Sequence, residues 1–156
     1  MIREAVINDF EQLQSIVQEV HNLHCEARPD VYNDVTEPLS KDYFNGLIIN
    51  NETKVFVIDI ENEIVAYSIL KVSKTQNIPI LRPSAYVYID DLAVKASYRN
   101  NGLGKKLFAY IKEFAKDINA DSIQLNVWEF NKPAIDFYES IGMKTRNRRM
   151  EIRINR

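Results

Sequence analysis

Apolar residues recur along this chain at two spacings, helical in some stretches and strand-like in others. The helical spacing comes first, at Phe10, Leu13, Ile16, Val17, Val20 and Leu23. It predicts a helix of about four turns with one apolar face. Asn8 is placed to cap this helix, with Glu11 completing a capping box. Ser40 is placed to cap a second, shorter helix.

Runs rich in β-branched and aromatic residues predict strands. They cover residues 54–60, 64–72, 85–94 and 122–128, with a short run at 2–7. Residues 61–63 are expected to form a tight hairpin between the first two. After Gly142, residues 143–154 alternate and predict a terminal strand or hairpin.

The order of elements between residues 85 and 142 predicts the topology. A strand, the amphipathic run at 103–118, a second strand and a second helix follow one another. A right-handed crossover makes such strands a parallel pair, whereas the earlier hairpins are antiparallel. The sequence therefore predicts an α/β fold over 1–156 as a single domain, with a mixed, mostly antiparallel sheet flanked by helices.

Composition limits the function classes. The chain has 156 residues, 46% hydrophobic and 27% charged, with a formal net charge of −2. That charge gives no electrostatic case for binding nucleic acid or an anionic membrane surface. No apolar run approaches the roughly 20 residues that span a bilayer, and no signal peptide is evident. With one cysteine, we expect no disulfide framework and a cytoplasmic location.

The most informative stretch is residues 90–106, where a strand turns into a helix. Gly102 and Gly104 lie in the turn, and Lys105 and Lys106 follow. Glycines let backbone N–H groups approach an anion, and the helix N-terminus adds partial positive charge. A phosphate or pyrophosphate is the expected ligand, although such glycines also serve as plain turn residues. The Rossmann pattern and the phosphate-loop pattern of NTPases both fail to fit.

Two motifs resemble those of the GNAT superfamily of N-acetyltransferases. Arg99-x-x-Gly102-x-Gly104 resembles the coenzyme A loop of that superfamily. The segment from Asn131 to Met143 is similar to its N-x-x-A-x-x-F-Y-x-x-x-G-F pattern, with Met143 in place of phenylalanine. The resemblance implies a GNAT fold, with the parallel strands splayed apart, and acetyl-CoA as co-substrate.

Acetyl transfer from a thioester to an amine requires loss of the amine proton, donors for an oxyanion, and an acid for the thiolate. The resemblance implies Tyr138 as the acid, although Tyr138 could instead be a packing aromatic. Asp90 and Asp91 are candidates for the base, and their side chains should point to opposite faces of a strand. This part of the chain resembles the spermidine/spermine-type acetyltransferases, which have a glutamate at the position that matches Asp90. Water alone could also take the proton.

The expected coenzyme contacts follow from the same resemblance. They are Leu92, Ala93, Val94, Arg99, Asn100, Asn101, Gly102, Leu103, Gly104, Lys105, Asn131 and Tyr138. A backbone N–H near Leu92 or Val94 is the expected oxyanion donor. Asn100 should tolerate left-handed backbone geometry, and Asn131 could also cap the following helix.

The acceptor is expected near the loop after the first helix, with His24, Glu26 and Arg28 as substrate-binding residues beside Asp90. His21, His24, Cys25 and Glu26 lie close enough in sequence to raise the question of a metal site. No second cluster of ligands accompanies them, so we expect no metal.

The predicted function is an acetyl-CoA-dependent N-acetyltransferase that acts by direct attack of a primary amine in a ternary complex. The acidic residues favour a small cationic amine over a protein N-terminus or lysine. The alternative is a non-catalytic module that binds or senses acyl-CoA, for which the aspartates and Tyr138 would be unnecessary. The oligomeric state is open, and the last strands could pair across a two-fold axis in a homodimer.

Overall fold

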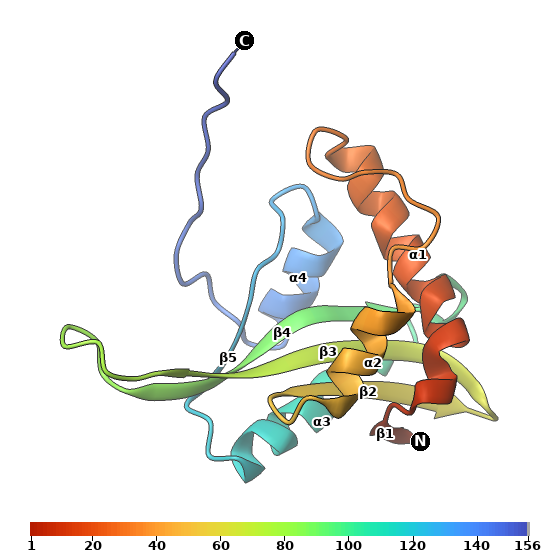
Figure 1. Ribbon diagram of the computed structural model, residues 1–156, viewed down its shortest axis with the longest axis horizontal. Coiled ribbons are helices and arrows are strands. Elements are labelled where there is room, and N and C mark those ends of the chain that lie inside the picture. The colour runs from red at the N-terminus through yellow and green to blue at the C-terminus, as the bar shows by residue number, and fades with distance from the viewer. Residues whose placement is uncertain (156) are drawn as a thin grey trace. The chain divides into compact units, whose positions relative to one another are not determined.

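A five-stranded sheet organises the first of two compact units, Met1–Asn126, in the computed structural model, which describes residues 1–155. The strands lie in sequence order: β1 (Ile2–Glu4), β2 (Thr53–Ile60), β3 (Glu63–Thr75), β4 (Ser84–Val94) and β5 (Ser122–Leu125) (Figure 1). The pairs from β1 to β4 are antiparallel, and β4 with β5 is parallel. The predicted mixed α/β fold is confirmed.

Helices cover both faces of this sheet. The helices α1 (Phe10–Ala27) and α2 (Lys41–Ile49) lie on one face and α3 (Leu103–Asp117) on the other (Figure 1). Side chains alternate along β2 accordingly. Val55 and Val57 belong to the core formed with α1 and α2. Phe56 points to the other face, where its ring centroid lies 5.0 Å from that of Tyr110 and 5.4 Å from that of Phe114, both on α3.

The first helix begins and ends differently from the prediction. Residues Ile7–Asp9 form a 3-10 turn and α1 starts at Phe10, so Asn8 is not its cap. Asp9 instead accepts the Val6 N–H and pairs with Arg3, each at 2.8 Å. At the other end α1 runs to Ala27 and includes residues expected in a loop. The Ser40 cap is confirmed, because its Oγ accepts the Tyr43 N–H at 3.1 Å.

The hairpins follow local sequence rules. Glu61 and Asn62 join β2 to β3 with φ of 51° and 68°, the pair of left-handed residues that a tight two-residue turn requires. The strand predicted at 122–128 is shorter than expected and ends at Leu125. Within residues 1–155, no helix is both long and apolar enough to span a membrane.

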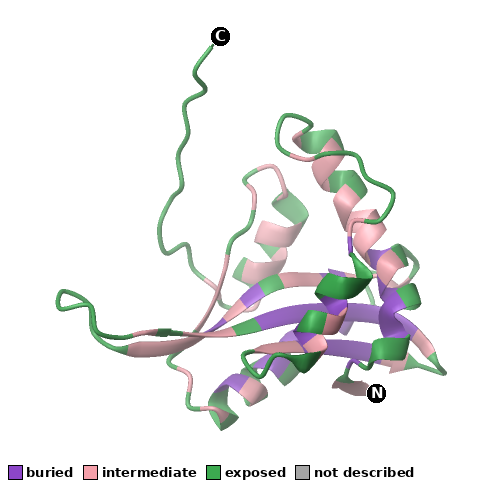
Figure 2. Ribbon diagram, in the orientation of Figure 1, coloured by how far each residue is buried: buried purple, intermediate pink, exposed green. Residues whose placement is uncertain are grey.

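The second unit, from Val127 onward, contains α4 (Lys132–Ser140) and a following stretch. The strand predicted at 143–154 is wrong: residues 143–155 form no helix or strand. An alternating sequence becomes a strand only where a neighbouring strand offers backbone partners. Nearly all of this stretch is exposed, as Figure 2 shows.

Candidate functional site

The parallel strands stop pairing where the predicted chemistry begins. β4 and β5 pair at four positions, from Tyr86 with Ser122 to Ile89 with Leu125. β5 ends at Leu125, whereas β4 continues for five more residues, to Val94. The expected opening of the parallel pair therefore lies beside residues 90–94 of β4.

A β-bulge marks the same point on the other side of β4. Ile69 pairs with Asp91 and Leu70 pairs with Ile89, which leaves Asp90 as the extra residue. A bulge re-aims side chains and increases the local twist. Both predicted carboxylates therefore lie at a bulge of β4, directly after Ile89, the last β4 residue that pairs with β5.

Asp91 is held by a buried tyrosine from the neighbouring strand. The Tyr67 hydroxyl donates a hydrogen bond to Asp91 Oδ2, and Tyr67 is only 1% exposed. Burial raises the pKa of Asp91 to about 6, the Tyr67 hydrogen bond opposes that rise, and the nearby Asp90 charge adds to it. Asp91 is thus a carboxylate at neutral pH with a stronger affinity for a proton than an exposed aspartate has.

Asp90 is exposed and faces a different tyrosine. Burial raises the pKa of Tyr43, and the charge of Asp90 and a hydrogen bond to it raise it further. Tyr43 lies on α2 and is 50% exposed, so solvent reaches this pair. The two aspartates therefore contact two tyrosines from different elements: half-buried Asp91 contacts the buried Tyr67, and exposed Asp90 contacts the half-exposed Tyr43.

The register of β3 with β4 determines where backbone donors point. The Lys95 N–H donates to the Val65 carbonyl at 2.8 Å. Hydrogen-bonded and non-bonded pairs alternate along an antiparallel ladder. Leu92 and Val94, opposite Ser68 and Ala66, therefore turn their N–H groups away from β3, toward the side where β5 has ended. The Leu92 N–H donates to the Asp91 carboxyl, whereas the Val94 N–H has no hydrogen-bond partner within residues 1–155.

The turn into α3 has the geometry expected of an anion-binding loop. Asn100 and Gly102 have φ of 64° and 76°, and Gly102 is the N-cap without a side-chain capping bond. Within residues 1–155, the N–H groups of Leu103, Gly104 and Lys105 make no hydrogen bond. The first N–H groups of a helix are available to an anion when nothing caps them.

Two glutamates fix the start of this loop. Glu63 Oε1 accepts from Lys95 Nζ at 2.8 Å, and its Oε2 accepts from the Tyr98 hydroxyl at 2.7 Å. Glu19 of α1 accepts the Ala96 N–H at 2.9 Å. The Arg99 Nε donates to the Val94 carbonyl at 3.0 Å, so this expected phosphate ligand turns back toward β4.

The expected acceptor residues lie at the end of α1 rather than in a loop. His24 and Glu26 are on its last turn, and Arg28 follows as its C-cap. The His24 ring stacks on Tyr32 at 5.0 Å, and burial with the nearby His21 lowers the pKa of His24. The Arg28 guanidinium pairs with Asp30 at 2.8 Å. In the described part of the chain, no group of three or more potential ligands is placed to hold a metal ion.

The two remaining candidates belong to the second unit. Asn131 caps α4, and its Oδ1 accepts the Ala134 N–H at 3.3 Å. Tyr138 lies on the same helix and is half-buried, with its ring edge-on to Phe137.

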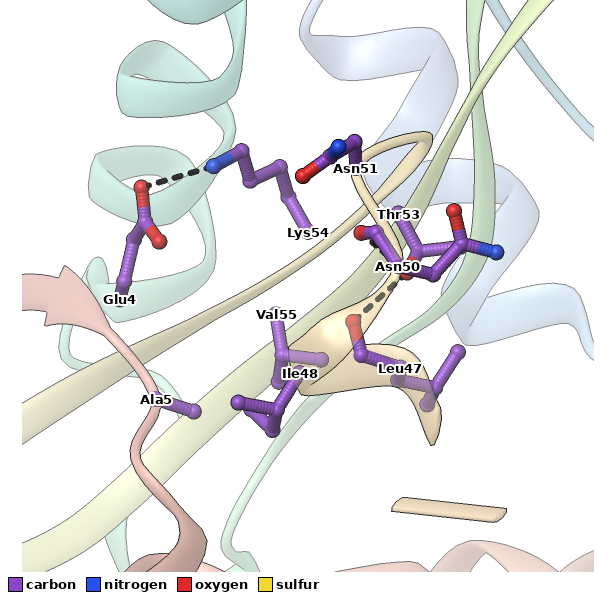
Figure 3. A pocket seen from close by; sticks show the side chains of 9 residues that line it. All are labelled: Glu4, Ala5, Leu47, Ile48, Asn50, Asn51, Thr53, Lys54 and Val55. Carbon is purple, nitrogen blue, oxygen red and sulfur yellow. Dashed lines mark hydrogen bonds and ion pairs between the residues drawn. The ribbon is translucent and has the colours of Figure 1, made fainter. Parts of the chain in front are cut away.

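A pocket on the first unit contains none of these residues. It lies between the end of α2 and β2, and its lining includes Leu47, Thr53 and Lys54 (Figure 3). Its polar groups bond one another: Lys54 Nζ is 3.1 Å from Glu4 Oε1, and Thr53 Oγ1 donates to the Leu47 carbonyl at 2.7 Å. We therefore assign no chemistry to it.

Sequence reasoning missed Tyr67, Tyr43, Glu63 and Glu19. Each acts through a contact between elements that are distant in sequence, so no local motif marks it. The one available signal was Tyr67, which with Ser68 places a hydroxyl inside the mostly apolar run 64–70. A buried tyrosine usually has a hydrogen-bond partner.

Comparisons with known proteins agree with this geometry. The family model for the acetyltransferase (GNAT) family matches residues 17–143. A putative ribosomal protein bS18-alanine N-acetyltransferase of Bacillus subtilis is 28% identical over 130 residues, 80% of each chain. A thialysine N-epsilon-acetyltransferase of Sus scrofa is 34% identical over 58 residues, 37% of this chain, and the match spans 34% of that enzyme.

Among solved structures, a mutant protein from Bacillus halodurans matches with a TM-score of 0.97 and 31% identity, over 99% of both chains. The family model indicates an acetyltransferase. The end of β4–β5 pairing and the start of α3 after Gly102 agree with that assignment. The chain belongs to the GNAT family of acetyltransferases.

Proposed function

We propose that this protein transfers the acetyl group of acetyl-CoA to a primary amine, by direct attack within a ternary complex. The observation that carries the proposal is the end of β4–β5 pairing at Ile89 and Leu125. It leaves the Val94 N–H, Asp90 and Asp91 beside one opening, ahead of the uncapped N-terminus of α3.

The coenzyme is assigned to the loop and to the opening. The N–H groups of Leu103, Gly104 and Lys105 bind the pyrophosphate with the α3 dipole and the Lys105 charge. Gly102 supplies the left-handed turn that aims them, since its φ is 76°. The Val94 N–H donates to the thioester carbonyl oxygen and stabilises the oxyanion that forms there.

The chemical step needs two proton transfers. The substrate ammonium loses a proton to Asp91, or to water held by Asp90 and Asp91, and the amine nitrogen attacks the carbonyl carbon. The carbon–sulfur bond then breaks, and the Tyr138 phenol gives its proton to the thiolate. The Tyr67 hydrogen bond supports this role for Asp91, because it fixes one carboxylate oxygen.

The acceptor is proposed to be a small cationic amine, with His24, Glu26 and Arg28 near its entry. Asp90 is exposed and carries its charge toward solvent, which suits an ammonium group. The relatives include one enzyme named for an amino-acid side-chain amine and one named for a protein alanine. A protein N-terminus is therefore the competing acceptor class.

The alternative is a module that binds acyl-CoA without turnover. The α3 loop alone would suit either function. The hydrogen bond between the buried Tyr67 and the half-buried Asp91 favours the enzyme, because removing a carboxylate from water costs free energy and a pure coenzyme binder has no need of it.

Initial-velocity kinetics test the direct-transfer proposal. With acetyl-CoA and amine varied together, reciprocal plots should intersect, because both substrates are bound before transfer. Parallel lines, or an acetylated protein isolated without amine, would reject direct attack in favour of a covalent intermediate.

A further inference from the structure

The carbonyl of Val94 faces the same side of β4 as its N–H group, the side on which β5 has ended. A strand residue that makes no backbone bond to the residue opposite it turns both of its backbone groups away from that strand. Val94 lies opposite Ala66, and the bond from the Lys95 N–H to the Val65 carbonyl identifies this pair as a non-bonded one. The carbonyl and the N–H of Val94 therefore lie together beside the opening.

Arg99 takes the place of the missing strand partner, but only for the carbonyl. Its Nε donates to the Val94 carbonyl oxygen at 3.0 Å. In the described part of the chain, the Val94 N–H has no such partner. A strand edge that would present a donor and an acceptor side by side thus presents the donor alone. This arrangement suits a thioester oxygen, which can only accept a hydrogen bond.

The surroundings of Arg99 argue against a role as a phosphate ligand. Its backbone N–H donates to the Ala96 carbonyl at 3.3 Å, and its Nη2 lies 3.7 Å from Glu19 Oε2. Glu19 also accepts the Ala96 N–H at 2.9 Å, which fixes its carboxylate near the guanidinium. A carboxylate in that position offsets the arginine charge and repels a phosphate.

We propose that Arg99 is a positioning residue for acetyl transfer rather than a phosphate ligand: it caps the Val94 carbonyl and leaves the Val94 N–H for the thioester oxygen. The inference rests on the proposed function, because it concerns the donor assigned there to the oxyanion. Negative charge develops on that oxygen as the amine attacks. An uncapped carbonyl beside the donor would repel this charge, so capping it stabilises the transition state more than the bound coenzyme.

Arg99→Gln and Arg99→Met separate the two roles. Glutamine has an N–H donor at the same number of bonds from Cα as the arginine Nε, without the charge, and methionine has a methyl group there. We expect both variants to keep the wild-type Kd for acetyl-CoA, measured by calorimetry. Loss of a phosphate ligand would instead raise Kd about tenfold in both, because a charge-assisted hydrogen bond contributes at least that much. Such a rise would overturn the proposal.

Nuclear magnetic resonance of the Val94 amide tests the positioning role itself. Acetyl-CoA carries the thioester oxygen that coenzyme A lacks, so the Val94 amide proton should lie further downfield with acetyl-CoA than with coenzyme A. This difference should persist in Arg99→Gln and shrink in Arg99→Met. Lys105→Met is the matched control, because it removes a charge assigned to the pyrophosphate: it should weaken acetyl-CoA binding and keep the Val94 difference at saturation.

Turnover gives a second measure of the same role. With an amine that the wild type acetylates, kcat should fall about tenfold in Arg99→Met and recover in Arg99→Gln. An undiminished Val94 difference or an unchanged kcat in Arg99→Met would reject the role of Arg99 alone. A wild type that binds no acetyl-CoA, or that shows no Val94 difference, would reject the proposed site and this inference with it.

Discussion

The carboxyl of Asp91 combines burial with charge. Its pKa is about 6, against a usual 3.8, because burial outweighs the hydrogen bond from Tyr67. The unfolded chain releases this proton at lower pH than the folded chain. Folding stability therefore falls as the pH rises from about 4 to 6 and stays reduced above that, by up to about 3 kcal/mol.

Asp91→Asn should therefore stabilise the protein while lowering its turnover. The neutral amide removes the charge from a desolvated position, so the Tm of the variant should exceed that of wild type at pH 7.5. The difference in Tm should shrink toward pH 4. Thermal unfolding at both pH values measures this, with acetyl transfer assayed at pH 7.5. A lower Tm at pH 7.5 would contradict the burial argument.

Tyr67→Phe should shift the acidic limb of the pH–rate profile of kcat/KM to higher pH. The hydrogen bond from Tyr67 lowers the pKa of Asp91, and Asp91 must be deprotonated to accept the amine proton. Tyr86→Phe on β4 is the matched control and should leave the limb in place. An unmoved limb in Tyr67→Phe would remove Asp91 as the proton acceptor.

Local rules explain which residues were predictable. Asn100 adopts the predicted left-handed conformation, and Asn131 caps α4 as one of its two predicted roles, because both depend on a few neighbouring residues. Tyr43 and Tyr67 reach the aspartates from α2 and β3. No spacing along the chain encodes such a contact.

At the scale of elements, the entry into α3 depends on one backbone conformation. A Cβ added at Gly102 or at Gly46 would meet no atom within 4 Å, but Gly102 has φ of 76°, whereas Gly46 lies within the α2 helix. Gly102→Ala should lower the free energy of unfolding by about 1–2 kcal/mol and weaken acetyl-CoA binding. Gly46→Ala should raise that free energy by about 0.5–1 kcal/mol. Urea unfolding measures both changes in the free energy of unfolding. Changes of the same sign in the two variants would contradict the conclusion that α3 depends on the left-handed backbone of Gly102.

The start of α1 depends on an ion pair that the sequence did not reveal. Asn8 and Glu11 fit a capping box, yet Arg3 of β1 holds Asp9 at 2.8 Å and Asp59 of β2 at 3.0 Å. This contact joins three elements, so tertiary structure overrode the local capping signal.

Asp9→Asn should accordingly destabilise the protein in a pH-dependent way. Although burial raises the pKa of Asp9, the bonds from Arg3 and the Val6 N–H lower it below its usual 3.8. Its contribution is thus complete above about pH 4 and disappears as the pH falls through the lowered pKa. We expect a loss of about 1–3 kcal/mol at pH 7, measured by urea unfolding. An equal loss at pH 2.5 would point to packing instead.

At the scale of the whole molecule, the sequence predicted the order of elements and the parallel pair, because periodicity and crossover handedness are strong constraints. It did not predict the bulge at Asp90, which depends on the register between β3 and β4. It also assigned residues 143–154 to a strand, whereas residues 143–155 form no helix or strand, because alternation alone does not supply the neighbouring strand that a ladder requires.

The most direct test of the proposed activity is thiol release from acetyl-CoA over a panel of amines. The panel should include polyamines, lysine analogues and peptides with N-terminal alanine, with Tyr138→Phe assayed beside wild type. We predict amine-dependent release on one acceptor class, strongly reduced in Tyr138→Phe while acetyl-CoA still binds. Tight coenzyme binding without release on any amine would contradict the enzyme assignment and favour the acyl-CoA-binding module.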